Sequence, residues 1–137
     1  SLSALEQAIF NVTKNAILYS GRGDEVRLRY HAITDQGVTV VISDNGVGIA
    51  KKDLPHIFEP FFRSRTDVMN PGGTGIGLAI VFDIVKLHHG KLHVDSRPGQ
   101  GTDFYITLPR HAEDYHARIP DDQGVTYDFS KAEGGPK

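Results

Sequence analysis

Apolar residues recur every three or four positions at the start of the chain and then follow shorter periods in several later segments. The first pattern is formed by Leu5, Ala8, Ile9, Val12 and Ala16. It predicts an amphipathic helix that ends near Tyr19. Ser3 and Glu6 have the spacing of a capping box, in which two side chains satisfy backbone N–H groups at the start of a helix.

Four later segments have the pattern of β-strands. Residues 26–33 alternate between apolar and polar side chains, which predicts a half-buried strand, and residues 38–43 predict a second strand with fuller apolar content. A turn at Gln36-Gly37 separates them, so we expect an antiparallel hairpin. Residues 91–96 and 102–108 predict two further strands.

A second long helix is predicted over residues 75–89, which are apolar on nearly all sides. We therefore expect it to be buried against the sheet and against a further element, and to end at Gly90. A short helix is predicted over residues 51–57. This order of elements predicts an α+β fold, a two-layer α/β sandwich in which about three helices cover one face of a mixed, mostly antiparallel sheet.

The composition is that of one globular domain without cysteine chemistry. The chain has 137 residues, 39% of them hydrophobic, a formal net charge of −2 and no cysteine. These values exclude disulfides and thiolate zinc sites, and they disfavour nucleic acid as a partner. No apolar run approaches the about 20 residues of a membrane helix, so we expect no direct membrane contact by this domain.

The pattern weakens after Pro109. Residues 1–110 are predicted to form the domain. Residues 111–137 are predicted to be a C-terminal tail or linker, poorly ordered or peripheral, with a short extra strand near residues 125–129.

Two features carry candidate chemistry. Gly73-x-Gly75-x-Gly77 leads directly into the second long helix, and glycines before a helix N-terminus suit a phosphate group. Tight packing of the helix on a strand is the alternative, and the spacing matches neither common nucleotide fingerprint. Asn11 and Asn15 lie one turn apart on a flank of the apolar stripe, where they are either solvated or directed at a cation or ligand.

The order and spacing of five motifs resemble one family. The motifs are Asn11-x-x-x-Asn15, Asp44-x-Gly46-x-Gly48, an aromatic cluster (Phe58, Phe61, Phe62) ending at Arg63, Gly73-x-Gly75-x-Gly77, and Gly99-x-Gly101-Thr102-x-Phe104. Over residues 4–109 they are similar to the N, G1, F, G2 and G3 boxes of the catalytic and ATP-binding domain of sensor histidine kinases. That domain has the Bergerat fold of the GHKL superfamily.

The resemblance implies ATP and Mg²⁺ as cofactors and assigns roles to residues. Asp44 would accept a hydrogen bond from the adenine amine, because an ionised carboxylate only accepts and would repel the carbonyl of guanine. Thr102 would assist through a water, and the side-chain oxygen of Asn15 would bind Mg²⁺. Residues 64–72 would be the ATP lid. The residues expected to hold the nucleotide are Asn15, Tyr19, Asp44, Gly46, Gly48, Ile49, Gly73, Thr74, Gly75, Ile76, Gly77, Leu78 and Thr102.

Arg63 and Asn11 are the expected catalytic residues. The resemblance places Arg63 at the γ-phosphate. Related ATPases carry a glutamate at the position of Asn11 as general base for water, and an amide cannot accept that proton, so Asn11 argues against efficient hydrolysis. The family usually carries a basic residue where this chain has Leu18, so we expect lower ATP affinity. The alternatives are another GHKL-type ATPase or serine protein kinase, or a degenerate nucleotide-binding interaction module.

None of the seven histidines stands in the sequence context of a phosphoacceptor. The resemblance therefore implies that the γ-phosphoryl group passes to a histidine on a separate dimerisation domain of the parent kinase, and from there to a response regulator. It also implies a cytoplasmic domain of a membrane-bound sensor kinase.

Overall fold

The fold was established from a computed structural model, which describes residues 2–18, 25–34, 37–62, 77–109 and 124–129. The elements in chain order are α1 (Leu2–Leu18), β1 (Val26–Thr34), β2 (Gly37–Asp44), the 3₁₀ turn η1 (Leu54–His56), α3 (Gly77–Leu87), β3 (Lys91–Ser96), β4 (Thr102–Pro109) and β5 (Val125–Asp128). All four strands predicted from the main pattern are confirmed, with ends that differ by at most one residue.

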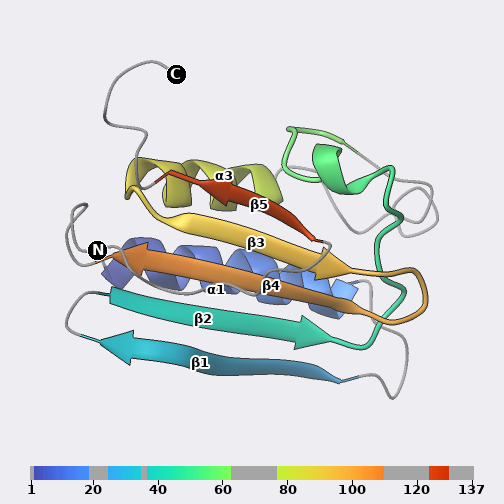
Figure 1. The fold of residues 1–137 in the computed structure, drawn as a ribbon, viewed down its shortest axis with the longest axis horizontal. Coiled ribbons are helices and arrows are strands. Elements are labelled where there is room, and N and C mark those ends of the chain that lie inside the picture. The colour runs from blue at the N-terminus through green and yellow to red at the C-terminus, as the bar shows by residue number, and fades with distance from the viewer. Residues whose placement is uncertain (1, 19–24, 35–36, 63–76, 110–123, 130–137) are drawn as a thin grey trace.

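The strands form one sheet in the order β1-β2-β4-β3-β5. Every pairing within the described part of the chain is antiparallel. Helices α1 and α3 lie side by side on one face of this sheet (Figure 1). The predicted α+β sandwich is therefore confirmed, with more regular antiparallel pairing than the sequence indicated.

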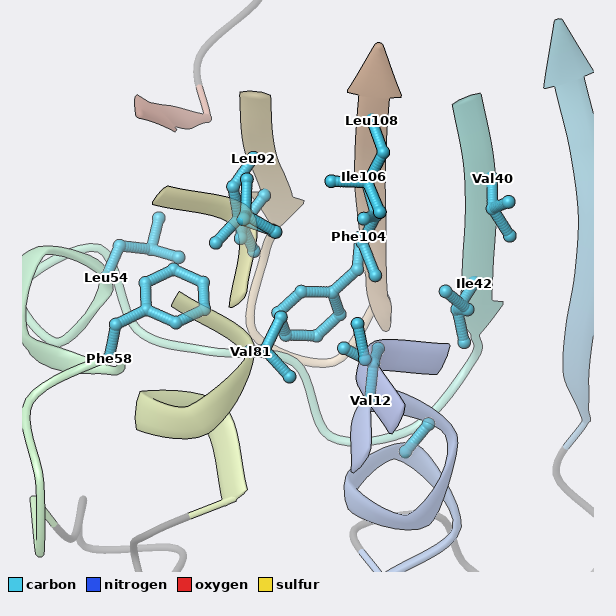
Figure 2. Close-up of a cluster of buried hydrophobic side chains, with 14 residues drawn as sticks. Val12, Val40, Ile42, Leu54, Phe58, Val81, Leu92, Phe104, Ile106 and Leu108 are labelled. Carbon is cyan, nitrogen blue, oxygen red and sulfur yellow. The ribbon is translucent and has the colours of Figure 1, made fainter. Parts of the chain in front are cut away.

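The core lies between the sheet and the two helices. Val40 and Ile42 of β2 and Phe104 of β4 face Val12 of α1 and Val81 of α3, and each of these side chains is almost completely buried (Figure 2). Burial of one such side chain stabilises a fold by about 1.5–3 kcal/mol. The alternation along β2 and β4 thus decides which residues face the helices.

Two helix predictions differ from the structure near the helix ends. Helix α1 begins at Leu2, so Ser3 lies inside the first turn and does not precede the helix as a capping residue. The short helix predicted over residues 51–57 is the 3₁₀ turn η1 with turns on either side. Pro55 inside η1 explains the difference, because proline donates no hydrogen bond.

Helix α3 is not buried on all sides. Ala79, Val81 and Val85 are buried, but Ile80 is 38% exposed and Leu87 is 75% exposed. The expectation of burial against a second element is met on one flank by α1, whereas the outer face meets solvent.

The end of α3 also has a different cause from the one predicted. His89, not Gly90, has the left-handed backbone conformation, with a φ of 58°. The N–H of Gly90 donates to the Val85 carbonyl at 2.9 Å and the N–H of His89 to the Lys86 carbonyl at 3.1 Å, which is a Schellman arrangement. Gly90 is required by space, because a Cβ there would lie 2.2 Å from the Thr107 carbonyl oxygen.

Strand β5 forms the sheet edge beyond β3, at the place where the sequence predicts a short extra strand. Leu92 is opposite Tyr127, and the N–H of Phe129 donates to the Gly90 carbonyl at 2.8 Å. On the other face, the Nδ1 of His93 and the hydroxyl of Thr126 share a hydrogen bond of 2.6 Å. The strand is thus held on both faces of the sheet.

Candidate functional site

Several predicted motifs meet at one end of the molecule. Strands β2 and β3 end there, β4 and α3 begin there, and the C-terminal end of α1 points the same way (Figure 1). Motifs that are far apart in the sequence therefore lie at one edge of the sandwich.

Asp44 and Thr102 are directly opposite each other in the β2–β4 pair. Two residues further into the sheet, Ile42 is opposite Phe104, and both of those side chains belong to the core. Because side chains alternate between faces, Asp44 and Thr102 lie on the same, helix-covered face of the sheet. The predicted adenine-reading pair is thus brought together by strand register.

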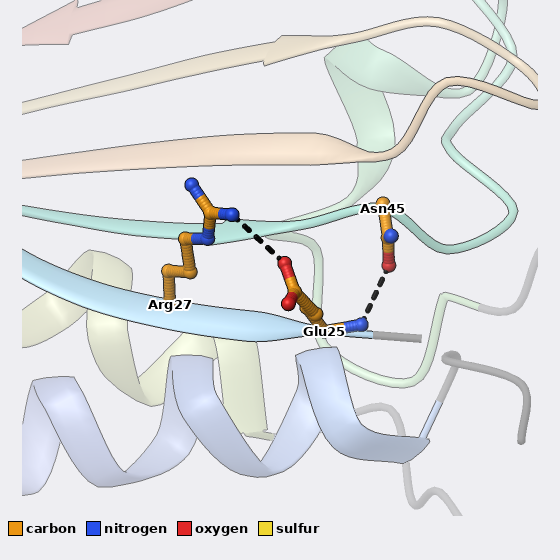
Figure 3. A network of polar contacts seen from close by, with 3 residues as sticks. All are labelled: Glu25, Arg27 and Asn45. Carbon is orange, nitrogen blue, oxygen red and sulfur yellow. Dashed lines mark hydrogen bonds and ion pairs between the residues drawn. The ribbon is translucent and has the colours of Figure 1, made fainter. Parts of the chain in front are cut away.

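The turn after Asp44 is held by side-chain hydrogen bonds. The Asp44 Oδ1 accepts from the N–H of Gly46 at 2.9 Å, which fixes an Asx turn. The Asn45 side-chain oxygen accepts from the N–H of Glu25 at 2.7 Å, and Arg27 in turn pairs with the Glu25 carboxylate at 2.9 Å (Figure 3). The turn is therefore anchored to the start of β1.

The loops that follow β2 and β3 interlock through glycine. A Cβ on Gly48 would lie 1.9 Å from the Arg97 carbonyl oxygen, and a Cβ on Gly101 would lie 2.0 Å from the Asp44 carbonyl oxygen. Both glycines have positive φ, of 75° and 83°, which side-chain-bearing residues rarely adopt. The N–H of Gly99 donates to the Val47 carbonyl at 2.7 Å. Two motifs that the sequence showed separately are thus one structural unit.

Asn11 links the two helices at the candidate site. Its Nδ2 donates to the carbonyl of Gly77, the first residue of α3, at 3.3 Å, and its Oδ1 accepts from Gln7 at 3.0 Å. A glutamate could not donate to that carbonyl, so the amide has a structural reason to be there. Asn11 thereby fixes the start of α3 against α1.

Asn15 lies one turn beyond Asn11 and is partly buried. Its amide oxygen is a hard ligand of the type that Mg²⁺ prefers. Within the described residues, no group of three or more histidine or acidic side chains could hold a metal ion. A single amide oxygen suits an ion that takes most of its ligands from elsewhere, which is how Mg²⁺ is usually bound together with substrate phosphates.

The three aromatic residues before Arg63 have separate environments. Phe58 is buried and packs on Phe82 and Phe104, with ring centroids 5.8 Å and 6.4 Å away. Phe62 stacks on His56 at 5.6 Å, whereas Phe61 is 69% exposed. Phe58 is therefore a core residue, and its burial anchors the backbone of residues 58–62 to the core.

The remaining predicted residues divide into two groups. Ile49 and Leu78 are partly buried against the core, which fixes the backbone of the turn after β2 and the start of α3. The other predicted positions lie outside the described residues, and so does the predicted lid; they are Tyr19, Arg63, Gly73, Thr74, Gly75 and Ile76.

The sequence reasoning missed two residues of this region, Asn45 and Ser96. Ser96 accepts a hydrogen bond from the N–H of Ile49 at 2.8 Å and also contacts Gly101 and Thr102. A serine at the end of a strand carries no signal of its own in a sequence, and one of its partners, Ile49, is 47 positions away.

No helix within the described ranges is long and apolar enough to cross a membrane.

The chain is similar to characterised kinases over most of its length. It is 40% identical over 105 residues to the adaptive-response sensory kinase SasA of Crocosphaera subtropica, covering 77% of this chain and 27% of that protein. The solved structure of the mycobacterial sensor histidine kinase MprB matches with a TM-score of 0.70 and 37% identity, covering 80% of this chain and 74% of that one. Full-length ShkA in complex with AMPPNP matches with a TM-score of 0.65 and 30% identity, covering 77% of this chain and 21% of that one.

The chain thus spans about a quarter of the length of the curated relatives, 27% for SasA. Residues 2–112 match the family described as Histidine kinase-, DNA gyrase B-, and HSP90-like ATPase. The match includes both the interlocked loops and the Asn11–Gly77 contact. This chain therefore belongs to that family, within which its relatives are sensor histidine kinases.

Proposed function

We propose that this chain is the ATP-binding catalytic domain of a sensor histidine kinase. It binds Mg²⁺–ATP and donates the γ-phosphoryl group to a histidine on a separate dimerisation domain. The observation that carries the proposal is the pairing of Asp44 with Thr102 on the helix-covered face, at the end of the sheet where Asn11 holds the start of α3.

The base would be read at the end of β2. The Asp44 carboxylate is fixed by its bond to the N–H of Gly46, so its orientation is set before a ligand arrives. An exocyclic amine donates to a carboxylate, whereas the carbonyl of guanine would meet two acceptors. Adenine nucleotides are therefore the ligands that the site favours.

The phosphates would lie between α1 and the start of α3. Asn15 would contribute a side-chain oxygen to Mg²⁺, which neutralises phosphate charge when bound. The first backbone N–H groups of α3 have no partner within the helix and attract an anion. Tyr19, Arg63 and the predicted glycine-rich stretch would complete the phosphate contacts.

The transfer step forms one bond and breaks one. An imidazole nitrogen of the acceptor histidine attacks the γ-phosphorus, and the bond from that phosphorus to the bridging oxygen breaks to release ADP. The protein positions these groups and stabilises charge, since phosphoryl transfer demands little covalent chemistry from it. Asn11 offers no carboxylate to activate water, which favours the histidine over hydrolysis.

The parent protein and its partners belong to the same proposal. The chain covers about a quarter of its curated relatives, and the seven histidines lack the context of an acceptor. We therefore place the acceptor on another domain of a membrane-bound sensor kinase, with this domain on the cytoplasmic side and a response regulator downstream.

The proposal is tested by mixing the chain with ATP labelled in the γ-phosphate, once with and once without the histidine-bearing domain of its parent kinase. Label should appear on histidine only in the mixture. Asn15→Ala should abolish the signal, and Lys14→Ala, at an exposed neighbouring position on the same helix, should leave it unchanged. Rapid phosphate release by the chain alone would favour an ATPase instead, and no binding of ATP would favour a degenerate module.

A further inference from the structure

Ser96 makes three hydrogen bonds at the last position of β3. Its hydroxyl oxygen accepts from the N–H of Ile49 at 2.8 Å, lies 2.9 Å from the carbonyl oxygen of Gly101, and lies 2.7 Å from the hydroxyl of Thr102. These partners come from both interlocked loops and from the first residue of β4. One small side chain thus connects all the segments around Thr102.

The chemistry of these partners fixes the direction of every bond. A carbonyl oxygen can only accept, so the single hydroxyl proton of Ser96 is donated to Gly101. The backbone N–H of Ile49 can only donate, so it occupies one lone pair of the Ser96 oxygen. The Thr102 hydroxyl must therefore donate its own proton to the second lone pair of Ser96.

This direction decides what Thr102 offers to a ligand. With its proton committed to Ser96, the Thr102 oxygen presents only lone pairs. Asp44, directly opposite in the β2–β4 pair, is an acceptor as well. A ligand group or bridging water between the two must donate to both, which an amine with two N–H bonds does and a carbonyl cannot.

We propose that Ser96 is a positioning residue for base selection: it holds Thr102 as an acceptor and so strengthens the preference for adenine over guanine. The inference rests on the proposed function, because it concerns the nucleotide bound at that site. Without Ser96 the Thr102 hydroxyl is free to rotate and to donate to a carbonyl. The penalty on a guanine nucleotide would then fall.

The test compares the affinities of the chain for Mg²⁺–ATP and Mg²⁺–GTP. Ser96→Ala should reduce the ratio of the two affinities by roughly tenfold, the usual size for one buried hydrogen bond that discriminates. Ser96→Thr keeps the hydroxyl and should restore the ratio. A general loss of stability would lower the affinities for ATP and GTP by the same factor. The ratio of the two affinities therefore distinguishes a positioning role of Ser96 from a role in folding.

Ser43 provides the matched control. It precedes Asp44 on β2, and its hydroxyl is buried without a hydrogen-bond partner among the described residues. Ser43→Ala should leave the affinity ratio unchanged, since no bond is lost. Thr102→Val should lower the ratio as Ser96→Ala does, and the double variant should lower it no further.

The outcomes are distinct. An unchanged ratio in Ser96→Ala, with ATP preferred by the parent protein, would overturn the role of Ser96 and leave the proposed function intact. A parent protein that does not bind ATP would overturn both. If Ser96→Ala fails to fold, a normal ratio in Thr102→Val would overturn the inference by itself.

Discussion

Glycines in the nucleotide motifs are needed for two different physical reasons. Gly48 and Gly101 have left-handed backbones, and a Cβ on either would collide with a carbonyl oxygen of the neighbouring loop. A Cβ on Gly77 would meet no described atom within 4 Å. Packing therefore explains the first two glycines and leaves Gly77 without a structural reason among the described residues.

Gly77→Ala should separate binding from stability. Alanine in a helix is more stable than glycine by up to about 1 kcal/mol, so the free energy of unfolding should be unchanged or higher. The added methyl group would stand at the start of α3, where a phosphate would approach the backbone, so ATP affinity should fall. Urea unfolding and nucleotide titration measure the two effects.

Gly101→Ala is the control for that experiment, because it should lower both quantities through the clash with Asp44. An ATP affinity of Gly77→Ala equal to that of the parent would show that no phosphate lies close to this residue.

Phe61 is a strained residue at an exposed position. It has a φ of 65°, a conformation that bulky side chains avoid, and it is 69% exposed. Phe61→Gly should therefore raise the free energy of unfolding by up to about 1 kcal/mol, because the strain relieved, about 1–2 kcal/mol, exceeds the entropy that glycine adds to the unfolded chain, about 0.4–1 kcal/mol. Chemical denaturation measures this change, and a decrease in stability would mean that Phe61 makes contacts with the remainder of the chain that outweigh the strain. Strain of this kind is common at functional positions.

At this scale, residue chemistry was predictable where it is local and unpredictable where it is distant. Asp44, Gly48 and Gly101 carry signals within motifs of five or six residues. Ser96 and Asn45 each bond a backbone N–H far along the chain, 47 and 20 positions away, and nothing in the sequence around them indicates those bonds. The sequence predicts that α3 ends at Gly90, because glycine is the usual residue there, whereas the left-handed residue is His89.

Strand β5 joins the two elements on either side of residues 63–76. The ring of Tyr127 lies nearly perpendicular to that of Phe58, which precedes that stretch, and to that of Phe82 of α3, which follows it, with centroids 5.5 Å and 5.1 Å away. Phe129 adds a second contact to Phe82 at 5.1 Å. An aromatic pair of this geometry contributes about 0.5–1.5 kcal/mol beyond its buried area.

Tyr127→Leu should lower the free energy of unfolding by about 1–3 kcal/mol, because both aromatic pairs are lost. Tyr127→Phe keeps the ring and should be nearly neutral at pH 7. Thr126→Ser, at the neighbouring position on the opposite face, keeps the hydroxyl that bonds His93 and tests whether the effect belongs to the ring cluster or to the strand as a whole. Equal losses in Tyr127→Leu and Thr126→Ser would refute the cluster as the cause.

Tyr127 also predicts that the free energy of unfolding depends on pH in the alkaline range. Burial, followed by the negative charge of Glu59, raises the pKa of Tyr127 above its ordinary value of 10.0. The folded protein therefore keeps the phenol proton where the unfolded chain releases it. This contribution to stability is complete below pH 10 and is lost as the pH rises towards the folded pKa. Tyr127→Phe should reduce the decline in stability above pH 10, as measured by denaturation at several pH values.

Strand ends were predicted to within a residue whether or not the strand alternates. Strand β1 alternates between apolar and polar residues, whereas β2 and β4 contain four and five consecutive buried residues. Helix α3 is apolar all round, a pattern that normally indicates complete burial, yet Ile80 and Leu87 are exposed. When a helix has no polar face, hydrophobicity alone does not predict which of its sides is buried.

At the scale of the molecule, the strand order β1-β2-β4-β3-β5 creates the site. Hairpins between neighbours in sequence were predictable, but the insertion of β4 between β2 and β3 was not, because it depends on pairing across the whole chain. That insertion places Thr102 opposite Asp44. A different order would keep every motif but separate Asp44 from Thr102, the pair proposed to read adenine.

Ligand binding should be visible in the stability of the whole domain. A ligand that binds only the folded state at 100 times its dissociation constant stabilises it by about 2.7 kcal/mol. For a chain of 137 residues this corresponds to a rise in Tm of roughly 9 °C. We expect this rise with Mg²⁺–ATP, a much smaller one with Mg²⁺–GTP, and a reduced one with ATP in the presence of a chelator.

Asp44→Asn makes this measurement specific to the base. The amide oxygen can still accept from the N–H of Gly46, so the turn is kept, but the amide NH₂ can now donate to a guanine carbonyl. The shift with ATP should fall and the shift with GTP should rise, while the Tm without nucleotide changes little. Equal shifts for the two nucleotides in the parent protein would contradict base reading by Asp44, even if both nucleotides bind. Asp44 and Thr102 are opposite each other only because β2 and β4, which are distant in the sequence, are neighbours in the sheet. This experiment therefore tests whether that strand pairing gives the domain its preference for adenine.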